Sequence, residues 1–256
     1  MRFKEVVILE NERLGEYEGR IWIHDKDLAR EAKPGQFAML SVVGFSNPFL
    51  PRAISINRVV GEKVAFAYQE VGEGTRLLGK LVEGNTLKIL GPLGNGFDLS
   101  PRDSHLMLIG GGIGRAPIEW LTEVLYSKGN KITLVLGAKT KEGLGGLLDT
   151  RRLDGVTLHL LTEDGSIGQK GLVTDLVAHA DQVDCFYACG PTPMMEAIKH
   201  IAQKKNIPLQ ISLEGKMACG VGVCLGCTCN SKTTDHYHKV CKDGPVFWAE
   251  EVDLSW

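Results

Sequence analysis

Three cysteines near the C-terminal end of the chain are spaced as ligands of an iron–sulfur cluster are. Cys219, Cys224 and Cys227 form a C-x4-C-x2-C pattern, and Cys241 follows after thirteen further residues. A two-iron cluster takes four thiolates, and this spacing is typical of plant-type [2Fe–2S] proteins. Glycines inside the loop would let the backbone wrap closely around such a cluster. The pattern therefore predicts a [2Fe–2S] site.

Other interpretations of these cysteines remain open at this point. A structural zinc site usually combines two C-x2-C pairs, a pairing that this loop lacks, and buried free thiols are a further alternative. Cys229 could substitute as a ligand or simply be a small buried side chain. Five of the seven cysteines fall between Cys219 and Cys241. This clustering favours metal or redox chemistry over dispersed disulfides.

A glycine-rich turn could bind the phosphates of a nucleotide. The run Gly110-Gly111-Gly112-Ile113-Gly114 follows a strand-like segment and precedes a helix-like one. Such glycines let the backbone approach a pyrophosphate, and the following helix offers free N–H groups. Position 115 is Arg, so the G-x-G-x-x-G pattern is not met and a tight structural turn is the alternative. We predict that Gly110, Gly111, Gly112 and Gly114 bind a dinucleotide.

A second turn, Cys189-Gly190-Pro191, also lies between a strand and a helix. This places it at the carboxyl edge of a parallel sheet, where ligands bind, and Cys189 is expected near a nicotinamide. The alternative is a buried small residue in a sharp turn. Residues 162–166 (TEDGS) are a third candidate, with solvated loop acids as the alternative. Lys139 stands where an acidic ribose ligand is often found, so NADH and NADPH both remain possible.

Two segments of the N-terminal part could contact a flavin nucleotide. The Arg52 guanidinium could grip a diphosphate as a bidentate fork, and Ser55 could hydrogen-bond a flavin ring edge. On its own, an Arg-x-x-Ser pair is more typical of exposed strand residues. The segment Gly72-Glu73-Gly74-Thr75 is similar to a phosphate-binding turn that opens a helix.

Three sequence segments would have to position these residues. Residues 1–99 contain short β-branched runs separated by Gly and Pro, which predicts an antiparallel β barrel. Residues 100–213 alternate strand-like and helix-like runs, which predicts a Rossmann-like, doubly wound α/β domain. Residues 214–256 have little apolar bulk, so a coordinated group must organise a small third domain. The predicted barrel strands are 5–9, 18–24, 36–42, 53–58, 63–69 and 86–90.

Composition narrows the class of protein. The chain has 256 residues, of which 43% are hydrophobic, and a net charge of −2. This is ordinary for a soluble globular protein and gives no support to nucleic-acid or anionic-membrane binding. No apolar run approaches the roughly 20 residues that span a bilayer. We see no signal peptide and expect a cytoplasmic protein.

The order of these motifs resembles the ferredoxin–NADP⁺ reductase superfamily with a cluster domain appended. Within it, the chain looks most similar to the electron-transfer subunits of NAD-dependent (class 1B) dihydroorotate dehydrogenases. The residues that carry this resemblance are 217–227 (MACGVGVCLGC), 240–247 (VCKDGPVF) and 93–97 (LGNGF).

The resemblance implies cofactors and a set of binding residues. NAD(H) would be the co-substrate, and no side chain would be needed as a catalytic acid or base. Cys219, Cys224, Cys227 and Cys241 would hold the [2Fe–2S] cluster. This family usually has Pro at the place of Ala53 and often Arg at the place of Gln69. FAD would be held by Arg52, Ala53, Ile54, Ser55, Ala67, Tyr68, Gln69, Gly74 and Thr75.

The resemblance also implies a partner. This would be an FMN-containing catalytic subunit that oxidises dihydroorotate to orotate in pyrimidine biosynthesis, joined to this chain in a two-plus-two heterotetramer. A reductase subunit of a ferredoxin-dependent transhydrogenase or of a hydrogenase complex is the alternative. A non-catalytic redox sensor is a second one, which the flavin and nicotinamide motifs disfavour.

Overall fold

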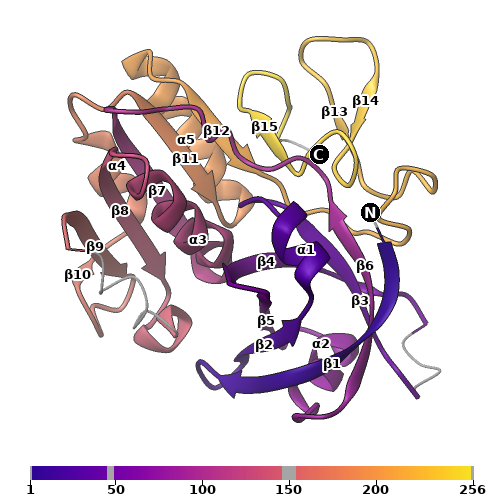
Figure 1. The fold of residues 1–256 in the computed structure, drawn as a ribbon. Coiled ribbons are helices and arrows are strands. Elements are labelled where there is room, and N and C mark those ends of the chain that lie inside the picture. Colours follow the sequence, from indigo (N-terminus) through magenta and orange to yellow (C-terminus); the bar gives the residue numbers. More distant parts are fainter. Residues whose placement is uncertain (1, 45–48, 146–153, 255–256) are drawn as a thin grey trace.

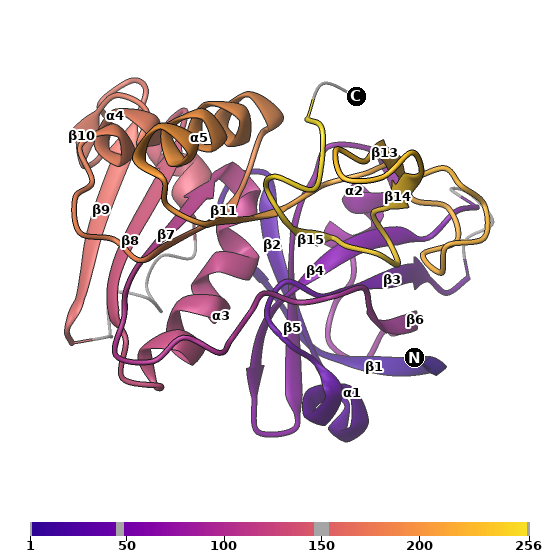
Figure 2. The same cartoon turned by 90° about the horizontal axis from the view of Figure 1, so that it is seen from above.

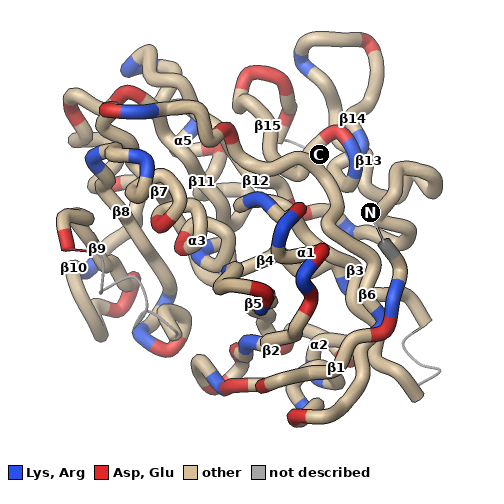
Figure 3. The backbone as a smooth tube through the Cα atoms, in the orientation of Figure 1, with Lys and Arg blue, Asp and Glu red and all other residues tan. Residues whose placement is uncertain are grey.

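The structure, a computed structural model, describes residues 2–44, 49–145 and 154–254. Figure 1 shows a β barrel and an α/β sheet side by side, with the C-terminal segment lying across both. Along the described residues, Lys and Arg are interspersed with Asp and Glu, without a long segment of one sign (Figure 3). Among the described helices, none has the length and apolar character needed to cross a bilayer.

Six antiparallel strands close into the barrel in the order β1-β2-β5-β4-β3-β6. β6 alternates buried and half-buried residues along its length, because one face of a barrel strand points into the core. The predicted barrel is confirmed, and each predicted strand overlaps an observed one. The strands are β1 Arg2–Arg13, β2 Glu18–His24, β3 Phe37–Val42, β4 Arg52–Val60, β5 Lys63–Gln69 and β6 Thr86–Leu93.

Two short helices accompany the barrel. The sequence interpretation missed α1 (Lys26–Glu31), which begins where the Asp25 carboxylate accepts a hydrogen bond from the Leu28 N–H at 3.0 Å. It predicted that a helix opens at residues 72–75, and α2 (Glu73–Gly79) begins there.

The second unit is a seven-stranded sheet in the order β10-β9-β8-β7-β11-β12-β15. All neighbouring pairs are parallel except β12 and β15, which are antiparallel. This confirms the predicted doubly wound α/β domain, and β15 is an addition that the sequence did not predict. Its strands are β7 His105–Gly111, β8 Lys131–Ala138, β9 Val156–Thr162, β10 Gln169–Lys170, β11 Cys185–Cys189, β12 Leu209–Ser212 and β15 Val246–Trp248.

Helices cover both faces of this sheet. Figure 2 shows α3 on one face and α4 and α5 on the other. α3 also packs against β4 of the barrel and so joins the two units. The helices are α3 Arg115–Tyr126, α4 Val173–Ala178 and α5 Thr192–Lys205, with 3-10 turns at Gly112–Gly114 and Lys141–Leu144.

The C-terminal segment has little regular structure of its own. β13 (Thr228–Asn230) and β14 (Tyr237–Lys239) form a small antiparallel pair beside the cysteine loop. A Cβ atom added to Gly220 would lie 2.6 Å from Met39 Cγ of the barrel, so this loop packs directly on β3. The segment therefore connects the barrel with the edge of the sheet.

Candidate functional site

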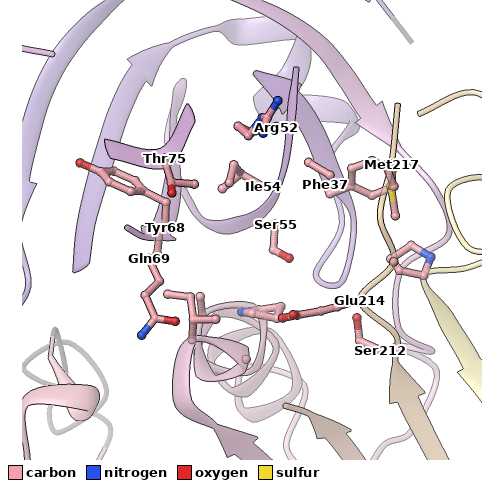
Figure 4. A pocket seen from close by; sticks show the side chains of 18 of the residues that line it. Phe37, Arg52, Ile54, Ser55, Tyr68, Gln69, Thr75, Ser212, Glu214 and Met217 are labelled. Atoms are coloured by element: carbon pink, nitrogen blue, oxygen red, sulfur yellow. The ribbon is translucent and has the colours of Figure 1, made fainter. Parts of the chain in front are cut away.

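A first cavity of about 570 Å³ lies between the barrel, residues 113–117 and the segment from Ser212 to Met217 (Figure 4). β4 and β5 are antiparallel neighbours, which brings two distant predicted segments into one wall. Eight of the nine residues predicted to contact a flavin line this cavity: Arg52, Ala53, Ile54, Ser55, Ala67, Tyr68, Gln69 and Thr75.

In this wall, the guanidinium of Arg52 has one N–H group without a hydrogen-bond partner among the described residues. Its Nη2 donates to the Leu50 carbonyl at 2.5 Å, whereas its Nε is buried without a hydrogen-bond partner in the described residues. The ninth predicted residue, Gly74, does not line the cavity but lies under Arg52. A Cβ on Gly74 would lie 2.9 Å from Arg52 Cδ, so a glycine is needed here for the arginine to lie across the start of α2. A guanidinium with an unused N–H fits the diphosphate of a flavin nucleotide.

Thr75 stiffens the turn before α2. Its Oγ1 accepts hydrogen bonds from the N–H groups of Val71 at 3.0 Å and Gly72 at 3.1 Å. These bonds hold the turn in a fixed shape beside Arg52, which suits a phosphate-binding position.

The sequence interpretation missed several residues of the first cavity. Phe37 lines it from β3 of the barrel. Ser212, Glu214 and Met217 reach it because the chain returns to the cavity from β12. Figure 4 shows Ser55, Gln69 and Glu214 directing their polar atoms into the space between barrel and sheet. Burial among surrounding atoms raises the pKa of Glu214, although its side chain is open to the cavity.

The two predicted nucleotide turns lie against each other. A Cβ on Gly114 would be 2.5 Å from the Cys189 carbonyl oxygen, and one on Gly111 would be 2.5 Å from Met194 Sδ. Gly114 and Cys189 line the first cavity, next to the flavin wall. Burial raises the pKa of the Cys189 thiol, which is therefore neutral at physiological pH.

A second cavity of about 850 Å³ lies on the other side of these turns, at the carboxyl ends of β7 and β8. Gly111, Gly112 and Pro191 line it, as the sequence predicted for a dinucleotide site. Gly110 and Gly190 line neither cavity. They are buried behind the turns, where a Cβ on Gly110 would be 2.8 Å from Arg115 Cα.

The second cavity also receives part of the third candidate segment. Glu163 and Lys139 line it. Asp164 does not, because its carboxylate accepts hydrogen bonds from Ser166 N–H at 2.9 Å and Ser166 Oγ at 2.7 Å within its own turn. Gln69 lines both cavities, so the two lie next to each other on either side of this residue.

The cysteine loop is organised by N–H groups that point at sulfur. Cys219 Sγ accepts from the N–H groups of Val221 and Val223, both at 3.4 Å. Cys241 Sγ accepts from Gly222 N–H at 3.1 Å, and Cys227 Sγ accepts from Cys241 N–H at 3.4 Å. Such donors stabilise thiolates and adjust the potential of iron–sulfur clusters.

Two features of this loop bear on its chemistry. Burial opposes ionisation of Cys219, but the N–H groups of Cys224, Val221 and Val223 outweigh it and lower its pKa to about 6. Among the described residues, no three potential ligands converge as a single metal ion requires. Four thiolates with N–H groups that point at sulfur are the donor set that a [2Fe–2S] cluster takes.

The cysteine segment matches a known family of domains. Residues 214–253 match the iron–sulfur cluster binding domain of dihydroorotate dehydrogenase B. The electron transfer subunit of dihydroorotate dehydrogenase B (NAD(+)) from Caldanaerobacter subterraneus subsp. tengcongensis is 42% identical, over 87% of this chain and 88% of the relative. This chain belongs to that family of electron transfer subunits. The same-named subunit of Fusobacterium nucleatum subsp. nucleatum is 33% identical over the full length of both chains.

Solved structures share the fold of this chain. An NADH-dependent reduced ferredoxin-NADP oxidoreductase has a TM-score of 0.86 and 29% identity, over 97% of this chain and 90% of the other. A ferredoxin NADP⁺ reductase from Neisseria gonorrhoeae shares the fold, with a TM-score of 0.65 at 18% identity, over 80% of this chain and 92% of the other. The predictions of fold, family and cofactors (FAD, an iron–sulfur cluster and NAD) are thereby confirmed. The names of the relatives favour the dihydroorotate system over the transhydrogenase or hydrogenase alternative.

Proposed function

We propose that this chain carries electrons between NAD(H) and a catalytic subunit that oxidises dihydroorotate. The observation that carries the proposal is the order of the sites: the second cavity adjoins the first at Gln69, and the first cavity is lined by residues 214–217, which lead directly into the cysteine loop. A bound flavin supplies the exchange between two-electron hydride and single electrons. The protein itself binds, orients and shields the reacting groups, without a catalytic acid or base.

Each cofactor has a proposed set of residues. FAD occupies the first cavity, held by residues 52–55, 67–69, Gly74 and Thr75, although Ala53 and Gln69 differ from the usual family residues. Support comes from the spare N–H of Arg52 and from the close packing of Gly74 beneath it. These binding roles correspond to three units, 1–99 for FAD, 100–213 for NAD(H) and 214–256 for the cluster.

NAD(H) occupies the second cavity, along Gly111, Gly112 and Pro191. Its nicotinamide end passes Gln69 to reach Gly114 and Cys189, while Gly110 and Gly190 act by letting the turns approach each other. The charged lining favours NADH over NADPH. Four carboxylates line the cavity and would repel a 2′-phosphate, against the single amine of Lys139; they are Glu16, Glu18, Glu142 and Glu163.

The cluster is bound by Cys219, Cys224, Cys227 and Cys241. Backbone N–H groups of the loop donate hydrogen bonds to the sulfur atoms of Cys219, Cys227 and Cys241. Cys224 lies beside Cys219, because its own N–H donates to that sulfur. Cys229 lies on β13, outside this set, and burial raises its pKa to about 11. Its place outside the loop that carries the other four cysteines assigns it as a buried structural thiol.

The partner is an FMN-containing subunit that docks over the cysteine loop, in a two-plus-two heterotetramer. Cys224 is exposed, and its neighbours Val223 and Leu225 are 77% and 61% exposed. An apolar surface beside a cluster ligand suits a partner that must bring its own cofactor close. The same docking would place both chains in one compartment, which we propose to be the cytoplasm.

The test is spectroscopic and enzymatic. Protein purified without air should show flavin and broad iron–sulfur absorbance, and NADH should bleach the flavin. The isolated chain should reduce artificial acceptors with NADH and form no orotate from dihydroorotate until the catalytic subunit is added. Orotate formation by the chain alone, or a colourless protein, would contradict the proposal.

A further inference from the structure

A buried carboxylate from the barrel forms part of the wall of the second cavity. Glu18 begins β2 and is 2% exposed, yet it lines the cavity. Its Oε2 accepts a hydrogen bond from Arg115 Nη2 at 2.5 Å. Its Oε1 is buried and has no hydrogen-bond partner in the described part of the chain. A buried carboxylate oxygen without a donor is unfavourable, so a donor from outside the chain would be stabilising there.

Arg115 is the ion-pair partner of this carboxylate. Arg115 is the first residue of α3, is 1% exposed and also donates to the Gly145 carbonyl. Its Nε lies 3.9 Å from Glu119 Oε1. Burial raises the pKa of Glu18, and the guanidinium opposes that rise. The Arg115 guanidinium donates to Glu18 Oε2 at 2.5 Å, which favours the carboxylate form, a group that only accepts hydrogen bonds.

The position of Glu18 shows which part of a dinucleotide it would meet. Glu18 pairs in register with Gln69 of β5, and Gln69 is the residue that lines both cavities. Glu18 therefore lies where the ligand passes from the second cavity towards the first. Phosphate groups carry no donor at neutral pH and are repelled by a carboxylate. Ribose hydroxyls are donors, and acidic residues bind them in other dinucleotide sites.

We propose that Glu18 is a nucleotide-binding residue whose Oε1 accepts a hydrogen bond from a ribose hydroxyl of NAD(H). The inference rests on the proposed placement of the dinucleotide in the second cavity. It assigns to the barrel a direct part in nicotinamide recognition. Arg115 is then a positioning residue, which holds the carboxylate and ties the glycine turn to β2.

The experiment compares NADH-driven flavin reduction in the wild-type protein and in Glu18→Gln. In Glu18→Gln the amide oxygen faces Arg115, and an uncharged NH₂ donor replaces the charged acceptor Oε1, which should raise the KM for NADH by about 10- to 100-fold, with the limiting rate of flavin reduction unchanged. Glu18→Asp keeps the charge opposite Arg115 but withdraws the oxygen, and should give the same KM effect. The matched control is Glu123→Gln, which alters another Glu–Arg pair between α3 and the barrel, with Arg58 Nε donating to Glu123 Oε2 at 3.1 Å, and which lines neither cavity. Its KM should change less than twofold.

Changing the ligand tests the same bond without changing the protein. NADH analogues that lack one ribose hydroxyl should bind the wild-type protein more weakly, and Glu18→Gln should remove that difference. Reduced nicotinamide mononucleotide carries only one ribose. If Glu18→Gln weakens it too, the bond is to the nicotinamide ribose, and if not, to the adenosine ribose. An unchanged KM for NADH in Glu18→Gln, or an equal penalty for every deoxy analogue in both proteins, would overturn the proposal.

A further variant separates this proposal from the placement on which it rests. Ala197→Trp would fill the second cavity from α5. If Ala197→Trp leaves NADH oxidation unchanged, the dinucleotide does not bind there, and both the placement and the proposal fail. If Ala197→Trp blocks the reaction and Glu18→Gln has no effect, the placement stands and only the role of Glu18 is refuted. Flavin and iron content, measured for each variant, report whether it has folded.

Discussion

Gly114→Ala is a test of how closely the two nucleotide turns must approach. Gly114 has φ −60° and ψ −13°, a helical conformation that alanine adopts without strain. The added Cβ would nevertheless lie 2.5 Å from the Cys189 carbonyl oxygen and 2.6 Å from its carbonyl carbon. Both are backbone atoms that cannot rotate away. The effect of the substitution is therefore purely steric.

The structure gives the size of the effect. The turns must separate by about 0.5 Å before the new contact reaches even 3.0 Å. Forcing one methyl group into a close-packed contact costs about 1–3 kcal/mol of unfolding free energy. Since a misplacement of ~1 Å can cost ~100-fold in rate, a shift of half that size should slow flavin reduction by NADH about tenfold.

The assay is anaerobic stopped-flow reduction of the flavin by NADH, with flavin and iron content measured on the same samples. Gly72→Ala is the control. Gly72 has an extended φ of −157°, and a Cβ there would meet nothing within 4 Å, so its rate should match the wild type. If the flavin of Gly114→Ala, at full cofactor content, is reduced by NADH at the wild-type rate, the contact between the turns does not set the nicotinamide position.

Four further results are expected. Gly74→Ala should displace Arg52 and weaken FAD binding about tenfold, measured by fluorescence of released flavin; unchanged binding would remove Arg52 from the flavin site. Cys224→Ala should lose the iron–sulfur absorbance and bind the catalytic subunit more weakly in a pull-down assay, and normal absorbance would contradict the ligand assignment. The Lys242 side chain packs on the cysteine loop, so Lys242→Gln should lower the midpoint potential of the cluster by ~30 mV, a threefold change in the equilibrium constant for one electron. An unshifted potential, measured by EPR during a redox titration, would exclude an electrostatic role for Lys242. Because burial raises the pKa of Cys189, iodoacetamide at pH 8 should not alkylate this thiol until urea unfolds the chain. If mass spectrometry shows labelling of Cys189 in the folded protein, the turn is not closely packed.

The sequence predicts those parts of the site that depend on short-range patterns. The barrel strands follow from β-branched runs between turns, and the nucleotide turns follow from glycines between a strand and a helix. The cysteine spacing is local as well. Each of these signals lies within a few residues, so no knowledge of the tertiary structure is needed to find it.

The remaining parts depend on contacts between distant segments. Phe37 lines the first cavity from β3, Glu214 lines it where the chain returns from β12 to the barrel, and neither carries a motif. Glu18 meets Arg115 across 97 residues of sequence. β15 has only three residues, too few to show a strand period before its pairing partner is known. Gly110 was expected at the ligand, but it lies behind the turn, a distinction that depends on packing.

The antiparallel pairing of β15 with β12 has a consequence for how the protein survives in a cell that lacks iron. β12 is made before β15, and until residues 246–248 pair with it, it presents unpaired backbone groups at the edge of the sheet. The segment that delivers β15 is the one that a cluster must organise. Iron shortage should therefore leave β12 as an unpaired, aggregation-prone edge strand of the nicotinamide domain. The chain should then become a substrate for chaperones and proteases rather than accumulate as an inactive flavoprotein.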